Sequence, residues 1–180
     1  MLNLVAIEER LNAGVYSKVF TKSLKLDEVI NTRLSRISEP ETSLYDDICE
    51  YISLKLPEFL RNSQDGKIKI YNEKFYQYAL IDNMTWSSIK NNNTANLTKK
   101  TLLKLIIALK LNYDEAERML RKFGLIFSEN DIQEQIILAV IDLREKYSQD
   151  YDVDEVKEIL FQYQEMYMKE GRSFTCIYKK

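Results

Sequence analysis

The residues that could carry chemistry gather between positions 79 and 112, beginning with "ALIDNMTWSSIKNNN". Residues 83–112 offer amides, hydroxyls and five lysines, with no Asp or Glu. Amide side chains can hydrogen-bond the edge of an adenine, and lysines can neutralise phosphates. The whole chain has a net charge of only −2. The lysines therefore form a local basic patch in a chain whose other segments are net acidic. For nucleic-acid binding, such a local patch matters more than the total charge.

Histidine is absent from the chain. This excludes Ser-His-Asp and Cys-His catalysis and HExxH zinc sites. Carboxylate chemistry survives that exclusion, but the sequence gathers no acids into an obvious site. Cys49 and Cys176 form neither a metal-like nor a redox-like pair. We therefore predict that the protein is not an enzyme and that it has no catalytic residue, metal or cofactor.

The composition favours an all-α fold. Among 180 residues, 45% are hydrophobic and 30% charged, and only 4 are Gly and 2 are Pro. Glu8 and Glu9 come too early for a secretory signal, and no apolar run approaches the roughly 20 residues of a membrane span. A cytoplasmic protein with no membrane partner is the expectation. "SEPETS" at 38–43 is the best linker candidate.

Apolar residues at three- and four-residue steps predict helices along most of the chain. We expect residues 1–40 to form an N-terminal helical extension, 41–127 the central domain, and 128–180 C-terminal helices and a tail packed on it. "KIKIY" at 67–71 breaks the helical pattern and predicts a short extended segment, with the tail "GRSFTCIYKK" as its partner. The predicted helix caps are Ser43 with Asp46, Asn72, Asp82, Thr98, Asn112 with Glu115, Ser128 with Asp131, and Asp152 with Glu155.

Residues 72–91 have the pattern of a helix-turn-helix, in which a second helix offers one face to a groove and the other to the core. Ile81 would fill the angle of the turn and Asp82 would cap the second helix. Trp86 and Ile89, three residues apart, would face the core. A tryptophan in that position is more often core than a platform for stacking a base. The outer face is then left to Asn83, Met84, Ser87, Ser88 and Asn91.

At this point the chain resembles a known family. The segment "FYQYALIDNMTWSSIKNNNTANLTKKTLLKLIIALKLNYDEAERMLRKFG" resembles a helix-turn-helix domain of the phage-repressor-like (Cro- and XRE-type) class. The likeness extends to a bacterial subgroup with a lysine-led fourth helix and a closing helix, to which "YDVDEVKEILF" at 151–161 is similar. The resemblance covers about residues 72–164. It implies a five-helix repressor-like bundle with additional N- and C-terminal helices, and DNA binding in bacteria or their phages.

Two departures from that family bear on function. Leu80 stands at the turn position often given to Gly or Asn, and it incurs a steric cost if its φ is positive. Asn83, Met84 and Ser88 stand where relatives often carry Arg or Lys. Of the five lysines, only about three can point the same way, because Lys104 and Lys110 lie on a helix that must also bury apolar residues.

The first hypothesis is a transcriptional regulator that binds double-stranded DNA as a homodimer. The base-reading residues would be Asn83, Met84, Ser87, Ser88 and Asn91, and the phosphate-contacting residues Lys90, Lys99 and Lys100. The alternative is a non-enzymatic interaction protein that binds a protein partner on the same scaffold, as a phage-encoded inhibitor of a nucleic-acid-handling enzyme or an antitoxin-like protein does.

Overall fold

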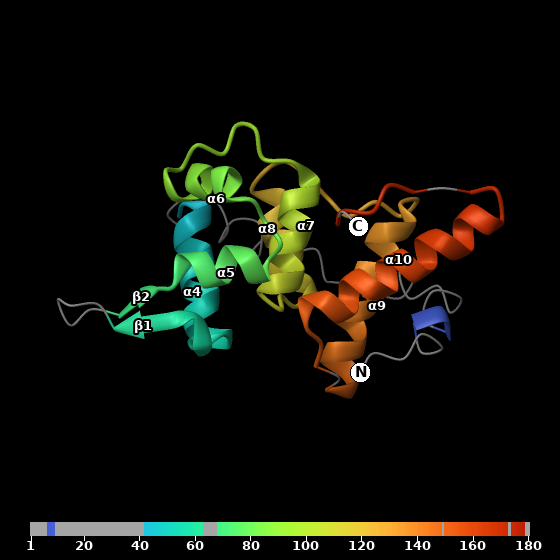
Figure 1. The fold of residues 1–180 in the computed structure, drawn as a ribbon, viewed down its shortest axis with the longest axis horizontal. Coiled ribbons are helices and arrows are strands. Elements are labelled where there is room, and N and C mark those ends of the chain that lie inside the picture. Colours follow the sequence, from blue (N-terminus) through green and yellow to red (C-terminus); the bar gives the residue numbers. More distant parts are fainter. Residues whose placement is uncertain (1–6, 10–41, 63–67, 149, 173, 179–180) are drawn as a thin grey trace, which may run out of the picture.

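The computed structural model describes residues 7–9, 42–62, 68–148, 150–172 and 174–178. Within these ranges the protein is mostly helical, with one very short antiparallel hairpin (Figure 1). The elements, in chain order, are α4 (Leu44–Lys55), the 3₁₀ helix η1 (Pro57–Phe59), β1 (Leu60–Asn62), β2 (Ile68–Ile70), α5 (Asn72–Tyr78), α6 (Asn83–Lys90), α7 (Lys99–Ala108), α8 (Tyr113–Arg121), α9 (Ile132–Tyr147) and α10 (Val153–Lys169).

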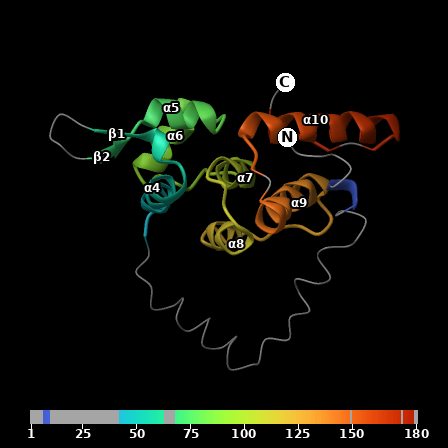
Figure 2. The same ribbon diagram turned by 90° about the horizontal axis from the view of Figure 1, so that it is seen from below.

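Helix α7 lies at the centre of this arrangement. Six of its residues are buried, including the continuous run from Leu105 to Ala108, so it packs against neighbours on more than one side. It contacts α8 and α10, while α6 packs on α4 and α5. Figures 1 and 2 show α4, α5 and α6 on one side of α7, with α9 and α10 on the other. The core therefore runs continuously through α7 from the first group of helices to the second.

Most of the predicted helix starts are confirmed. Reciprocal capping boxes begin α4, α8 and α10, because in each a side chain at the cap and one three residues later bond each other's backbone amides. Single caps begin α6 and α7. The side chains involved are Ser43 with Asp46, Asn112 with Glu115, Asp152 with Glu155, Asp82 and Thr98.

Two predicted caps are wrong. Tyr71 occupies the cap position of α5, and Asn72 is the first helical residue. The Asn72 side chain is instead turned toward α4 and α6, where it accepts hydrogen bonds. Helix α9 begins after Asp131 alone. Ser128 lies outside it, with its backbone held by Glu134 and Gln135 from the first turn of that helix.

The described part of the "KIKIY" segment contains a strand as predicted, but its predicted partner is wrong. Residues Ile68–Ile70 pair with Leu60–Asn62 in an antiparallel register, so the strand bonds to the chain just before it. The tail residues 174–178 form no strand; they pack on the C-terminal helices instead. The hairpin follows the C-terminal end of α4, and so lies at the opposite end of that helix from α6 (Figure 1).

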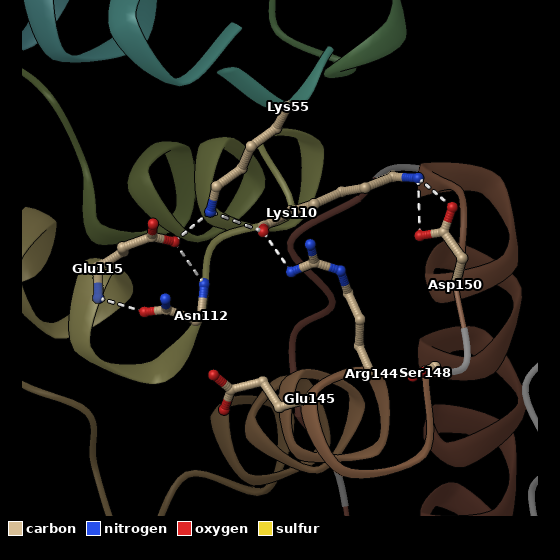
Figure 3. Close-up of a pocket in the computed structure, with 8 residues that line it drawn as sticks. All are labelled: Lys55, Lys110, Asn112, Glu115, Arg144, Glu145, Ser148 and Asp150. Carbon is tan, nitrogen blue, oxygen red and sulfur yellow. Dashed lines mark hydrogen bonds and ion pairs between the residues drawn. The ribbon is translucent and has the colours of Figure 1, made fainter.

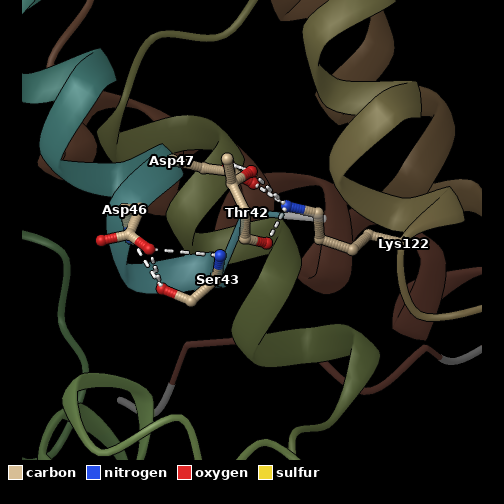
Figure 4. A network of polar contacts seen from close by, with 5 residues as sticks. All are labelled: Thr42, Ser43, Asp46, Asp47 and Lys122. Carbon is tan, nitrogen blue, oxygen red and sulfur yellow. Dashed lines mark hydrogen bonds and ion pairs between the residues drawn. The ribbon is translucent and has the colours of Figure 1, made fainter. Parts of the chain in front are cut away.

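The start of α4 is fastened to the end of α8 by a polar network (Figure 4). The Lys122 ammonium donates to the Thr42 carbonyl at 2.8 Å and forms an ion pair with Asp47. Because α8 also packs on α7, this contact helps to fix α4 relative to the centre of the fold.

The predicted N-terminal helical extension over 1–40 lies outside the described residues, apart from 7–9, which are helical. Ile7 is fully buried. No described helix is both long enough and apolar enough to cross a lipid bilayer.

Candidate nucleic-acid interface

Helices α5 and α6 are joined by a tight turn over residues 79–82. The Leu80 and Ile81 amides donate back to the Gln77 and Tyr76 carbonyls at 3.1 and 3.0 Å, which closes the end of α5. Ile81 is buried at the angle of the turn, as predicted. Asp82 then accepts from the amide of Thr85 at 2.8 Å and from its hydroxyl at 2.7 Å, which starts α6. These bonds hold the pKa of Asp82 below its usual value.

Leu80 has a φ of 52°, in the left-handed region. A residue with a Cβ incurs a cost of about 1–2 kcal/mol there, so the steric penalty anticipated for this position is present. The Leu80 carbonyl accepts a hydrogen bond from Nζ of Lys104 at 2.7 Å. Lys104 lies in the middle of α7, so the strained turn is tied directly to the central helix.

The inner face of α6 is buried as predicted. Trp86 and Ile89 are inaccessible to solvent, and the Trp86 ring packs edge-on against Tyr45 and at a tilt against Phe75. The indole Nε1 donates to Oδ1 of Asn72 at 3.2 Å. Trp86 is therefore a core residue that joins α4, α5 and α6, and it is not available to stack on a base.

The five predicted base-reading residues all lie on the outer side of α6 or at its end. Met84 is 82% exposed, and Ser88 is half-buried. The other three, which are Asn83, Ser87 and Asn91, are exposed. Nδ2 of Asn91 donates a long hydrogen bond of 3.5 Å to Oγ of Ser87, so these two polar side chains lie side by side on the outer face. The face is polar and nearly uncharged, with Met84 as its one large apolar side chain.

The three predicted phosphate-contacting lysines are placed differently from one another. Lys90 at the end of α6 and Lys100 in the first turn of α7 are exposed. Lys99 is half-buried, and its Nζ lies 2.6 Å from Oε1 of Glu134. Glu134 is only 4% exposed and also accepts from the Ser128 amide at 2.6 Å. In this conformation the Lys99 charge is directed toward the protein, which does not favour its predicted contact with a phosphate.

The other two lysines of the basic segment are bonded within the protein. Lys104 reaches Leu80, and the Lys110 ammonium bonds both carboxylate oxygens of Asp150 at 2.8 and 2.7 Å. The sequence expectation that Lys104 and Lys110 do not join the basic face agrees with these contacts. Lys90 and Lys100 remain as the outward-facing charges of the segment.

The surroundings of Lys110 form a polar cavity of about 600 Å³. The Lys110 carbonyl accepts from Nη1 of Arg144 at 2.5 Å and from Nζ of Lys55 at 3.3 Å, and Lys55 also forms an ion pair with Glu115 (Figure 3). Lys110 has a φ of 50° and follows the C-cap residue of α7. In this cavity two cations bind the backbone carbonyl of Lys110, just after α7, and the basic side chains of the lining are matched by acidic ones.

A second cavity, of about 680 Å³, lies beside Lys99 and the loop 124–130. Its walls include the stacked rings of Tyr113 and Phe127. No group of His, Cys, Asp or Glu side chains among the described residues could hold a metal ion. Burial raises the pKa of both the Cys49 and the Cys176 thiols, so neither has the lowered pKa of a reactive cysteine.

Sequence reasoning missed three residues that hold this interface together. The sequence predicts a cap at Asn72, gives no sign of a role for Glu134, and indicates for Lys104 only that it cannot face outward. An acid in the first turn of a helix is normally read as a favourable end charge, and nothing local distinguishes Glu134 from that case. A lysine within an apolar helix, such as Lys104 in "LLKLIIA", was the one available signal.

Comparison of the chain with models of protein families, with curated proteins and with solved structures finds no significant match.

Proposed function

We propose that the protein binds double-stranded DNA through α5 and α6, acting as a helix-turn-helix, and regulates transcription as a bacterial or phage protein of the repressor-like type. The observation that carries the proposal is the two-sided character of α6: Trp86 and Ile89 are buried, while the opposite side exposes amides and a hydroxyl. A helix of eight residues set on a tight turn is suited to entering a major groove. Exposed amide and hydroxyl groups are suited to reading base edges.

Lys90 and Lys100 support the same proposal, because exposed lysines that flank a reading helix neutralise phosphates and fix its register. Two such contacts supply little affinity to a single protomer. Each neutralised phosphate contributes a slope of about −0.9 to the logarithmic dependence of affinity on salt. A homodimer on two half-sites doubles the number of contacts, so we propose that the active form is a dimer.

Selection from a random pool of duplexes at about 50 mM salt, followed by anisotropy titration of the enriched duplex, tests the base-reading role. We expect a recurring sequence, and we expect Asn83→Ala and Ser87→Ala to relax the preference at particular base pairs by about 1–3 kcal/mol. Ser53→Ala, on the exposed side of α4, is the matched control and leaves the preference unchanged. A pool that shows no enrichment contradicts the proposal.

A protein partner is the second candidate, and Met84 is the observation that favours it. This side chain is 82% exposed on a face that carries almost no charge. Methionine adapts readily to apolar partner surfaces. A photo-cross-linking residue at position 84, used in the native cell, distinguishes the candidates. The second candidate is supported if the residue cross-links to a protein that binds the purified chain with one-to-one stoichiometry but does not bind the Met84→Glu variant. The first candidate is supported if the residue cross-links to DNA.

A further inference from the structure

The turn between α5 and α6 is linked to the C-terminal tail through a single side chain. Lys104 donates to the Leu80 carbonyl at 2.7 Å, and the same ammonium lies 5.3 Å from the centre of the Tyr178 ring. Lys104 comes from α7, Leu80 from the turn, and Tyr178 from the tail. We propose that Lys104 is a positioning residue that sets α5 and α6 against α7, and that the tail 174–178 is a clamp that holds Lys104 in this role.

Two hydrogen bonds fix the tail so that Tyr178 lies beside the Lys104 ammonium. The Phe174 carbonyl accepts from Nε2 of Gln164 at 2.9 Å, which fixes the tail to α10. The Ile177 amide donates to Oε1 of the buried Gln133 at 2.6 Å, which fixes it to α9. Cys176, Ile177 and Tyr178 are all buried. A segment with no regular secondary structure is thus held at two points and buries three consecutive side chains.

The location of Lys104 explains why a clamp on it would act on the turn. It is half-buried between the buried Leu103 and Leu105, and its bond to the Leu80 carbonyl is partly buried. An ammonium in such a place needs acceptors, and the Leu80 carbonyl and the face of the Tyr178 ring supply two of them. Leu80 is itself in a strained left-handed conformation. Strained turns persist only where surrounding contacts hold them, and the Lys104 bond is such a contact.

The tail also lies near the basic edge of the proposed interface. Burial raises the pKa of the Cys176 thiol, and the charges of Lys100, Lys104 and Lys157 act against that rise. Lys104, which contacts the Tyr178 ring of the tail, lies one turn from Lys100 on α7, so the tail is close to one of the two outward-facing lysines. Displacement of the tail would release the turn and alter the surroundings of Lys100 together. The link between the tail and the turn does not depend on DNA binding. Only its expected effect on the affinity for DNA rests on the proposed function.

Amide hydrogen exchange in the full chain tests the positioning role. Lys104→Met removes the ammonium and keeps most of the length, and it should speed exchange of the Ile81 amide by about tenfold or more, the factor expected when a hydrogen bond to a charged group is lost. Amides of α9 should be unaffected, which separates this effect from global destabilisation. Lys104→Arg should restore slow exchange. Lys100→Met, one turn earlier on the exposed side of α7, is the matched control.

Variants of Tyr178 test the clamp. Tyr178→Leu removes the ring and should speed exchange of Ile81 in the same direction, whereas Tyr178→Phe keeps the ring and should behave as wild type. The double variant with Lys104→Met should add nothing beyond Lys104→Met alone, because both act through one contact. Unchanged Ile81 exchange in Lys104→Met overturns the proposal, and fully additive effects of the two changes overturn the clamp.

DNA affinity gives an outcome that separates this proposal from the proposed function. If wild type binds a selected duplex, Lys104→Met and Tyr178→Leu should weaken binding by about tenfold, although neither side chain lies on the outer face. If wild type binds no duplex but the exchange results hold, the proposed function fails and the link between tail and turn stands. Unweakened DNA binding with fast turn exchange overturns the expected effect of this link on affinity.

Discussion

Nε1 of Trp86 lies 3.2 Å from Oδ1 of Asn72, which joins the buried side of α6 to the first residue of α5. The Tyr45 hydroxyl of α4 lies 3.4 Å from the same oxygen. One amide oxygen therefore serves two donors from two other helices. The orientation of α6, on which any use of its outer face depends, is set by this contact together with the apolar packing of Trp86.

Asn72→Ala removes the acceptor, leaves the indole donor of Trp86 unsatisfied in a buried site, and removes one partner of the Tyr45 hydroxyl. We expect the free energy of unfolding to fall by about 1–3 kcal/mol, the cost of unpaired buried polar groups. Urea unfolding followed by the fluorescence of Trp86 measures it. Asn83→Ala, on the exposed side of α6, should change stability by no more than about 0.5 kcal/mol. Equal effects of the two substitutions would contradict this account of Asn72.

Lys99 and Glu134 form a pair in which the carboxylate is almost wholly buried. Lys99→Met leaves that charge without its cation, and we expect a loss of about 2–4 kcal/mol of stability by thermal or urea unfolding. Lys99→Met combined with Glu134→Gln should recover much of the loss, because the uncompensated charge is gone.

The same pair affects how DNA-binding data on Lys99 are interpreted. If Lys99→Met is as stable as wild type, the ion pair does not hold in solution, and Lys99 returns to the set of phosphate contacts. If it is destabilised as expected, reduced DNA binding by a Lys99 variant reports on folding as well as on charge. Lys100→Met is the matched variant, because the Lys100 side chain is exposed at the start of the same helix.

Two serines give opposite responses to one substitution. Ser148 follows α9 with a φ of 53°, so Ser148→Gly relieves a left-handed strain and should stabilise the protein by about 1 kcal/mol. Ser87 lies within α6, where glycine is unfavourable, so Ser87→Gly should destabilise by about 0.5–1 kcal/mol. Thermal unfolding of both variants measures these changes. A change of the same sign in both would contradict the left-handed conformation of Ser148 at the end of α9.

Asp82 makes the start of α6 sensitive to acid. Bonds from Thr85 lower its pKa in the folded state, below the value of about 3.9 expected in the unfolded chain. A carboxylate with a lowered pKa contributes stability that is complete above the unfolded pKa and is lost as pH falls through the folded pKa. The stability advantage of wild type over Asp82→Ala should therefore be constant from about pH 7 to 5 and shrink below about pH 4. An advantage that is the same at pH 3 and 7 would refute this role of Asp82.

Local chemistry made much of the fold predictable. The caps at Ser43, Asp82, Thr98, Asn112 and Asp152 are short-range bonds between neighbouring residues, so sequence spacing is sufficient to find them. The same holds for the inner face of α6, because helical periodicity places Trp86 and Ile89 on one side. Ser128 and Asn72 were misassigned because their spacing also fits a cap, and only tertiary contacts show that their polar groups are used elsewhere.

The charges of the candidate site were harder to predict. Sequence proximity grouped Lys99 with Lys100, yet their ammonium groups face different surroundings, because the partner of Lys99 lies 35 positions along the chain. The contacts of Lys104 with Leu80 and Tyr178 span 24 and 74 positions. Long-range pairings of this kind depend on how the helices pack, and the local spacing of residue types does not determine helix packing. The residues of the outer face were predictable; which lysines remain available beside them was not.

The salt dependence of DNA binding measures whether Lys90 and Lys100 contact phosphates. On a selected duplex, the slope of log affinity against log salt should be about −2 per protomer, with Lys90 and Lys100 each contributing about −0.9. Lys90→Ala with Lys100→Ala should remove nearly all of that slope. Lys146→Ala with Lys169→Ala, on the C-terminal helices, should leave it unchanged. Failure of wild type to bind any selected duplex at about 50 mM salt, or an unchanged slope in the Lys90 and Lys100 variant, would contradict the account.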